Sequence, residues 1–273
     1  MTLPRIHAIE IHEQRWCPAS LRDTATDYLQ FVSNLTGAFS PIAPRLRDAL
    51  ARSGEKQVID LCSGGGGPWL GLLPEFEVGA APARVTLTDR YPNREACTRA
   101  VCESGGRIGF EAEPVEAMRV PVRLRGFRTL FAAFHHFRPA DARAILADAA
   151  ARGQPIAIFE ATERRVTGLL GMIFLVPLAT LFVMPFVRPF RLSRLVWTYL
   201  VPLAPLVIGF DGFVSCLRTY SSEELEGLTA GLGGEHYRWE IGVERGGPVG
   251  IPFAIGGPSG AVDSPAQGRQ TSR

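Results

Sequence analysis

Lysine, cysteine and histidine are scarce in this sequence of 273 residues. Lys56 is the single lysine, and the formal net charge is only +2, which argues against a basic nucleic-acid-binding protein. The five cysteines form no CxxC pair and the five histidines form no HExxH pair, so neither a disulfide framework nor a metal site is expected. The first 18 residues contain no apolar run of signal-peptide length, which favours a cytoplasmic protein.

Apolar residues are abundant instead, at 46% of the chain, and they allow a sizeable buried core. Between residues 57 and 160, short apolar runs alternate with helical patterns, which predicts a doubly wound, mostly parallel α/β sheet. The expected strands are residues 57–61, 84–89, 108–111, 128–133 and 155–160, and the expected helices among them are residues 93–103 and 139–152. Residues 237–243 and 249–255 are expected to close the sheet as an antiparallel edge.

The composition changes several times along the chain and predicts its organisation. Residues 1–55 are expected to form a helical cover of two helices, because prolines interrupt the apolar periodicity. Residues 56–165 and 211–256 are expected to form the α/β domain, and residues 166–210 an apolar insert within it. Residues 257–273 are rich in Gly, Ser, Pro and Gln, which predicts a disordered tail.

A glycine-rich loop follows the first expected strand and reads Cys62-Ser-Gly-Gly-Gly-Gly-Pro-Trp69. The dinucleotide fingerprint GxGxxG does not fit, because its third glycine would fall on Trp69 or Leu70, and a P-loop would need a lysine. Asp89 ends the next strand, 23 residues after Gly66, close to the spacing of an acid that binds two ribose hydroxyls. The pattern favours a nucleoside ligand without phosphates, such as S-adenosylmethionine; a glycine-rich turn without a ligand is the alternative.

In these features the chain resembles the class I S-adenosylmethionine-dependent methyltransferases, whose first motif is D/E-x-G-x-G-x-G. Here the motif reads Asp60-Leu-Cys62-Ser-Gly64-Gly-Gly66, with Cys62 in place of the first glycine. The resemblance implies a Rossmann-like fold and S-adenosylmethionine as cofactor. It places Asp60, Cys62, Ser63, Gly64 and Gly66 around the methionine end of the cofactor.

The same resemblance extends to later parts of the cofactor site. It implies that Asp89 holds the ribose and that Arg90 or Tyr91 flanks the adenine. The family often has an acid-Ala-x-x-Leu-Pro pattern after the third strand, in which the acid faces the adenine amine. Glu116-Ala-Met-Arg-Val-Pro121 matches this pattern, with Glu116 as the acid.

Two histidines follow the fourth expected strand, in Leu130-Phe-Ala-Ala-Phe-His135-His136, where the family often has Leu-His-His. Methyl transfer from a sulfonium is an in-line displacement, and an oxygen or carbon nucleophile usually needs a base to take its proton. His135 and His136 are therefore the candidate catalytic residues, as a base or as groups that orient the substrate. The alternative is that they cap the next helix or stack on the cofactor. Glu160 lies at the same sheet edge and is either near the ligand or solvated.

The apolar insert starts with 22 uncharged residues, 166–187, which at helical rise reach about 33 Å. A second uncharged run, residues 195–210, follows Arg188, Arg191 and Arg194. A two-pass hairpin would place these arginines on the far side of the membrane, against the positive-inside tendency. We therefore expect monotopic contact with the inner membrane surface through residues 166–210. The alternative is a soluble cap over the pocket that serves as a homodimer interface.

The sequence thus predicts an S-adenosylmethionine-dependent methyltransferase that acts on a small, hydrophobic or lipid-like acceptor, with no nucleic-acid partner. Two alternatives remain: a nucleotide-dependent oxidoreductase of Rossmann type, and a non-catalytic, membrane-associated cofactor-binding protein. Binding of S-adenosylmethionine but not NAD would separate the first alternative from the prediction.

Overall fold

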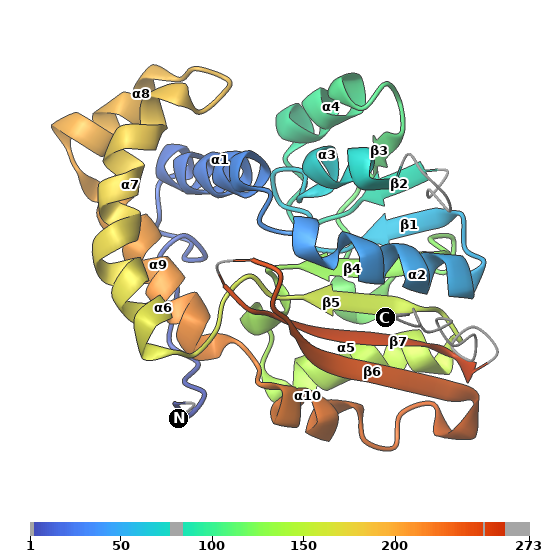
Figure 1. Cartoon of the computed structure of the whole chain (residues 1–273). Helices are drawn as coiled ribbons and strands as arrows, with labels where there is room; N and C mark the ends of the chain where they lie inside the picture. The colour runs from blue at the N-terminus through green and yellow to red at the C-terminus, as the bar shows by residue number, and fades with distance from the viewer. Residues whose placement is uncertain (1–2, 77–83, 248, 260–273) are drawn as a thin grey trace, which may run out of the picture.

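A seven-stranded sheet forms the centre of the computed structural model, which describes residues 3–76, 84–247 and 249–259 (Figure 1). The strand order is β3-β2-β1-β4-β5-β7-β6. The strands are β1 Gln57–Asp60, β2 Arg84–Leu87, β3 Ile108–Phe110, β4 Phe127–Phe131, β5 Ile156–Phe159, β6 Tyr237–Glu244 and β7 Ile251–Pro258. Strands β1 to β5 pair in parallel, and β7 pairs antiparallel with both β5 and β6. The predicted doubly wound, mostly parallel sheet with an antiparallel edge is confirmed.

Helices cover both faces of the sheet, because successive side chains of a strand point to opposite sides. Val58 of β1 packs in a core with Leu46 and Leu50 of helix α2 (Ala43–Ser53), whereas its neighbour Ile59 packs in a second core with Ile145 of helix α5 (Pro139–Ala151). The helices are α1 Ala19–Thr36, α2 Ala43–Ser53, α3 Trp69–Leu72, α4 Arg94–Glu103, α5 Pro139–Ala151, α6 Val166–Leu170, α7 Val176–Val183, α8 Leu192–Leu195, α9 Leu203–Arg218 and α10 Ser222–Thr229. Helices α2, α3 and α4 lie on the first face, and α5 and α10 on the second.

The apolar insert packs against α1 and stands apart from the sheet (Figure 1). Leu21, Ala25 and Tyr28 of α1 form a third core with Ala204 and Ile208 of α9. Residues Val166–Phe186 form one helical stretch of 21 residues that is long and apolar enough to cross a bilayer, and only 11% of its most apolar window is buried. Segments Leu192–Leu200 and Leu203–Arg218 form a second apolar pair, bent by 83°.

Two expected boundaries need correction. The insert was expected to end at residue 210, where the uncharged run stops, but α9 continues to Arg218. Asp211 is buried there and accepts hydrogen bonds from two backbone N–H groups, so its charge does not mark a surface. The tail was expected from residue 257, but β7 runs through Pro258 and pairs Gly257 with Arg238. The rest of the expected tail, residues 260–273, lies outside the described residues.

Candidate active site

The glycine-rich loop leaves β1 in a tight turn and enters α3. Four of its residues have positive φ: Cys62 at 59°, Gly64 at 54°, Gly66 at 122° and Gly67 at 60°. This left-handed backbone conformation costs a residue with a side chain roughly 1–2 kcal/mol of conformational energy. Cys62 occupies the position of the first glycine in the family motif, so the turn keeps the glycine conformation although the residue has changed.

Asp60 holds this loop from beneath. Its carboxylate accepts hydrogen bonds from Ser63 Oγ at 2.6 Å and from Thr129 Oγ1 of β4 at 2.6 Å. The side chain is 1% exposed, and burial raises its pKa from 3.8 to about 6. Asp60 therefore joins β1, β4 and the loop, and its carboxylate is enclosed by the protein.

Asp89 follows β2 and lies directly beside the loop. Its Oδ2 accepts a hydrogen bond from the backbone N–H of Gly64 at 2.8 Å, and its Oδ1 accepts one from Tyr91 at 2.8 Å. A carboxylate has about four acceptor positions, so these two bonds leave room for further donors. Arg90 and Glu116 form an exposed ion pair at 2.9 Å beyond it. The structure thus gathers the expected cofactor residues at the carboxyl ends of β1, β2 and β3.

Gln30 of α1 is a site residue that the sequence did not indicate. A Cβ built on Gly65 would lie 2.9 Å from Gln30 Oε1, and one built on Gly66 would lie 2.7 Å from Gln30 Nε2. The side chain therefore rests against the two glycines, and only residues without a side chain leave it this space. Gln30 precedes the loop by more than 30 residues and belongs to no recognisable spacing.

His135 is held by Glu160. It lies in the short 3₁₀ turn Phe134–His136 after β4, and its Nδ1 is 2.7 Å from Glu160 Oε2, while its backbone N–H donates to Glu160 Oε1 at 3.0 Å. Both residues are buried. Burial raises the pKa of Glu160, but the charge and hydrogen bonds of His135 outweigh this and lower it overall. Of the two options for Glu160, the structure places it against the histidine and away from solvent.

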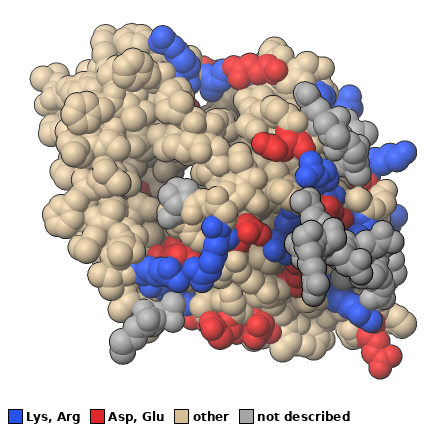
Figure 2. All heavy atoms as spheres, in the orientation of Figure 1, with Lys and Arg blue, Asp and Glu red and all other residues tan. Residues whose placement is uncertain are grey.

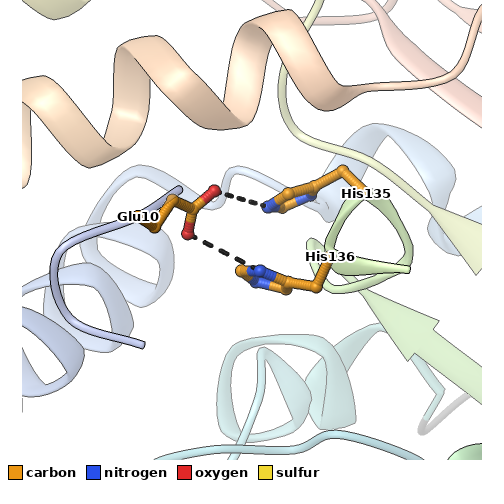
Figure 3. A group of neighbouring side chains, drawn as sticks. All are labelled: Glu10, His135 and His136. Atoms are coloured by element: carbon orange, nitrogen blue, oxygen red, sulfur yellow. Dashed lines mark ion pairs between the residues drawn. The ribbon is translucent and has the colours of Figure 1, made fainter. Parts of the chain in front are cut away.

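Glu10 of the N-terminal segment, residues 3–18, faces both histidines (Figure 3). Its Oε1 lies 3.7 Å from His135 Nε2, and its Oε2 lies 3.6 Å from His136 Nδ1. Arg218 approaches Glu10 Oε1 at 3.1 Å and Glu13 at 3.0 Å, and Glu13 lies 2.7 Å from His136 Nδ1. Glu10 is fully buried, and burial raises its pKa.

Helix α9 fixes the N-terminal segment in this position. Asp211 accepts hydrogen bonds from the backbone N–H groups of Ile11 at 2.6 Å and His12 at 3.0 Å. Arg218 Nε donates to the carbonyl of Ala8 at 2.7 Å. More than 120 residues separate Glu10 from the histidines, so no spacing rule could connect them.

Comparison with known proteins places this geometry in a wider context. No protein-family model matches the chain, and no curated protein does. Among solved structures, the O-methyltransferase NcsB1 of neocarzinostatin biosynthesis, in complex with S-adenosyl-L-homocysteine and 1,4-dihydroxy-2-naphthoic acid, superposes with a TM-score of 0.52 at 19% identity. The aligned region covers 86% of this chain and 58% of that one. The fold is that of the S-adenosylmethionine-dependent methyltransferases.

A second structure supports this methyltransferase fold. A candidate O-methyltransferase from Nostoc punctiforme superposes with a TM-score of 0.50 at 14% identity, over 88% of this chain and 61% of that one. The chain thus spans about three-fifths of the length of the solved proteins that it matches. The expected Rossmann-like methyltransferase fold is confirmed by these superpositions.

Proposed function

We propose that this protein is an S-adenosylmethionine-dependent methyltransferase that acts on a small, hydrophobic acceptor. One observation carries the proposal: the loop held to Asp89 and the pair His135–Glu160 follow the adjacent parallel strands β1 and β4. Ligands of open α/β sheets bind at the carboxyl ends of the strands. A nucleoside site and a titratable side chain at one such edge support transfer chemistry between two bound molecules.

The residues present fit S-adenosylmethionine. The loop residues Gly64, Gly66 and Gly67 have backbone angles that allow close approach of a ligand to the main chain. We propose that the free acceptor positions of Asp89 bind the ribose hydroxyls and that Glu116 faces the adenine amine. When bound, the cofactor supplies an electrophilic methyl group on a sulfonium.

We propose that His135 takes a proton from the acceptor. Nδ1 contacts Glu160, so Nε2 is the ring nitrogen that we propose as the proton acceptor. The buried surroundings exclude water, which would otherwise compete as the nucleophile. His136 is 27% exposed and adjoins Arg218, so it is better placed to orient an acceptor than to act as an enclosed base.

The complexes of one structural neighbour support the proposed class of acceptor. NcsB1 was solved with hydroxylated naphthoic acids, which are small and aromatic. An aromatic hydroxyl loses its proton near pH 10, so a neutral histidine at neutral pH assists its methylation. We therefore propose a small aromatic or lipid-like hydroxyl compound as the acceptor of this enzyme.

Calorimetry with S-adenosylhomocysteine and NAD tests the proposal. We expect micromolar binding of S-adenosylhomocysteine, no binding of NAD, and at least about 10-fold weaker binding by Asp89→Asn. The exposed Asp48→Asn on α2 is the matched control and should bind like the parent. Binding of NAD instead would favour the oxidoreductase. Cofactor binding without methyl transfer to any of a panel of hydroxynaphthoates and phenols would favour a non-catalytic protein.

We also propose that the insert contacts an anionic lipid surface and so gives the enzyme access to apolar acceptors from the cytoplasmic side. Phe174, Phe182 and Leu200 are among its many exposed apolar side chains. Figure 2 displays few charged groups over this part of the molecule. Residues 166–210 contain no acid, and the exposed Arg188 adds attraction to anionic headgroups of about 1 kcal/mol.

Flotation with phosphatidylglycerol-containing liposomes tests this contact. The parent should float with the lipid, and Phe182→Glu should float less. Val122→Glu is the control, because Val122 is equally exposed but lies outside the insert. A parent that stays in the lipid-free fraction, or that elutes as a dimer which Phe182→Glu dissociates, would overturn the lipid proposal and favour a homodimer interface.

A further inference from the structure

We propose that Glu10, His135 and His136 bind a divalent transition-metal cation of the zinc class. One donor atom from each residue lies within 4.8 Å of the others. Two imidazoles and one carboxylate form a donor set that suits Zn²⁺ and related first-row cations. A tetrahedral site with bonds of about 2.1 Å separates its ligands by about 3.4 Å. Glu10 Oε1 lies 3.7 Å from His135 Nε2, and Glu10 Oε2 lies 3.6 Å from His136 Nδ1. For one carboxylate oxygen to share a cation with both nitrogens, the side chains must close from separations of up to 4.8 Å.

Two buried atoms of this cluster have no hydrogen-bond partner among the residues that the structure describes. They are Glu10 Oε2 and His135 Nε2, on side chains that are 0% and 4% exposed. An unsatisfied buried acceptor usually costs about 1–3 kcal/mol, so such atoms call for a partner. Both atoms belong to the group that faces the centre of the cluster (Figure 3). A single cation would satisfy them together.

The arrangement around His135 is the one that metal-binding histidines commonly have. Glu160 accepts the Nδ1 hydrogen at 2.7 Å, which fixes the ring and leaves Nε2 as a donor of its lone pair. A carboxylate behind a histidine ligand orients the ring and raises its basicity. His135 therefore meets the cluster with its orientation already set.

The charge of the cluster favours a divalent cation. Glu10 and Glu13 contact the guanidinium of Arg218, and Glu160 contacts His135. With uncharged histidines, these three carboxylates and the one guanidinium carry two uncompensated negative charges. Arg218 contacts Glu10 Oε1 and lies 3.3 Å from His136 Nδ1, so it opposes a cation on that side. Glu10 Oε2 has no hydrogen-bond partner among the described residues, although His12 Nδ1 lies 3.6 Å from it, and we infer that a cation binds on this side. We expect micromolar affinity because Arg218 and Glu13 compete for His136.

This inference does not rest on methyl transfer, because it uses only the geometry of the cluster. In the metal site, His135 Nε2 binds a cation, whereas in the proposed methyl transfer the same nitrogen accepts a proton. An enzyme that is more active after chelation would use the nitrogen as a base, and a bound cation would then be inhibitory.

The test is direct metal binding by the full-length protein without an affinity tag. After dialysis against a chelator, Zn²⁺ and Co²⁺ are titrated and followed by calorimetry and by the visible absorption of Co²⁺. We expect one site per chain, and affinity at least about 100-fold lower in Glu10→Gln and in His136→Asn. Glu160→Gln should weaken binding by about 10- to 100-fold. The exposed His236→Asn is the control for non-specific binding to histidine and should match the parent.

His136→Asn guards against a folding artefact, because His136 is the most exposed of the three residues and its loss perturbs the core least. A parent that takes up no stoichiometric metal at micromolar concentration, or a folded His136→Asn that binds like the parent, would overturn the inference. Binding of S-adenosylhomocysteine is measured on the same preparations. A protein that binds S-adenosylhomocysteine but no metal would reject the metal site alone. A protein that binds metal but no S-adenosylhomocysteine would reject the proposed function alone.

Discussion

The buried carboxyl group of Asp60 makes folding stability depend on pH in a defined window. Its pKa rises from 3.8 in an ordinary environment to about 6 in the folded protein. Between these values the folded protein keeps a proton that the unfolded chain has lost. The stabilisation is fully present below about pH 4 and is lost as the pH rises through 6. A shift of roughly two pKa units corresponds to about 3 kcal/mol of unfolding free energy.

The variant Asp60→Asn isolates this contribution, because its amide does not titrate and its oxygen still accepts a hydrogen bond from Thr129 or Ser63. Urea unfolding of the cofactor-free protein, followed by tryptophan fluorescence between pH 4 and 7.5, gives the unfolding free energy of parent and variant. We expect the difference between them to shift by about 2–3 kcal/mol in favour of the variant as the pH rises across this range. Other titrating groups cancel in the comparison.

Asp48→Asn provides the baseline, since Asp48 is exposed on α2 and its curve should run parallel to that of the parent. A constant difference between parent and Asp60→Asn at every pH would refute the reasoning. It would mean that the hydrogen bonds from Ser63 and Thr129 fully offset the free-energy cost of burying the charged carboxylate.

Three further predictions concern stability, each measured by urea unfolding. Asp27→Ala leaves the buried guanidinium of Arg194 without its ion pair and should cost about 3–5 kcal/mol, whereas the double variant with Arg194→Met should recover most of this loss. Ser221→Ala removes the capping box of α10 and should cost about 1 kcal/mol. Gly126→Ala should cost more than about 3 kcal/mol, because its φ is 144° and a Cβ would lie 2.4 Å from the carbonyl oxygen of Gln57.

Matched variants define the outcomes that would contradict these predictions. Ser222→Ala tests the helix start without the cap, and a loss equal to that of Ser221→Ala would exclude the capping explanation. Gly153→Ala also has a positive φ, of 60°, but its Cβ would meet open space. An equal loss in both glycine variants would attribute the effect to backbone strain alone. A double variant at Asp27 and Arg194 that is no more stable than Asp27→Ala would exclude the unpaired charge as the cause.

Local patterns in the sequence were enough to predict the sheet and the loop. The parallel strands are short apolar runs, and the two acids Asp60 and Asp89 stand where runs end, so the edge at which they meet followed from strand direction. The capping box of α10 is equally local, because it joins Ser221 and Glu224, three positions apart. These features depend on neighbours along the chain, which is why periodicity and spacing reveal them.

The residues that sequence reasoning missed are those brought together by tertiary packing. Glu10 reaches His135 because α9 holds the N-terminal segment, and Gln30 reaches the loop because α1 packs on the insert. Neither contact follows from a periodic pattern or a fixed spacing in the sequence. Asp211 led to a wrong boundary. Its charge ends an apolar run in the sequence, but in the fold its buried carboxylate accepts hydrogen bonds and α9 continues past it.

The hydrogen bonds between Asp211 and the backbone of residues 11 and 12 can form only after α9 has been synthesised. Glu10 is synthesised about 200 residues before the helix that fixes its position. Until α9 leaves the exit tunnel, residues 3–18 lack this partner, and the cluster around His135 is incomplete. A nascent chain stopped before residue 211 should therefore expose residues 3–18 to proteases, and a chain that extends past α9 should protect them.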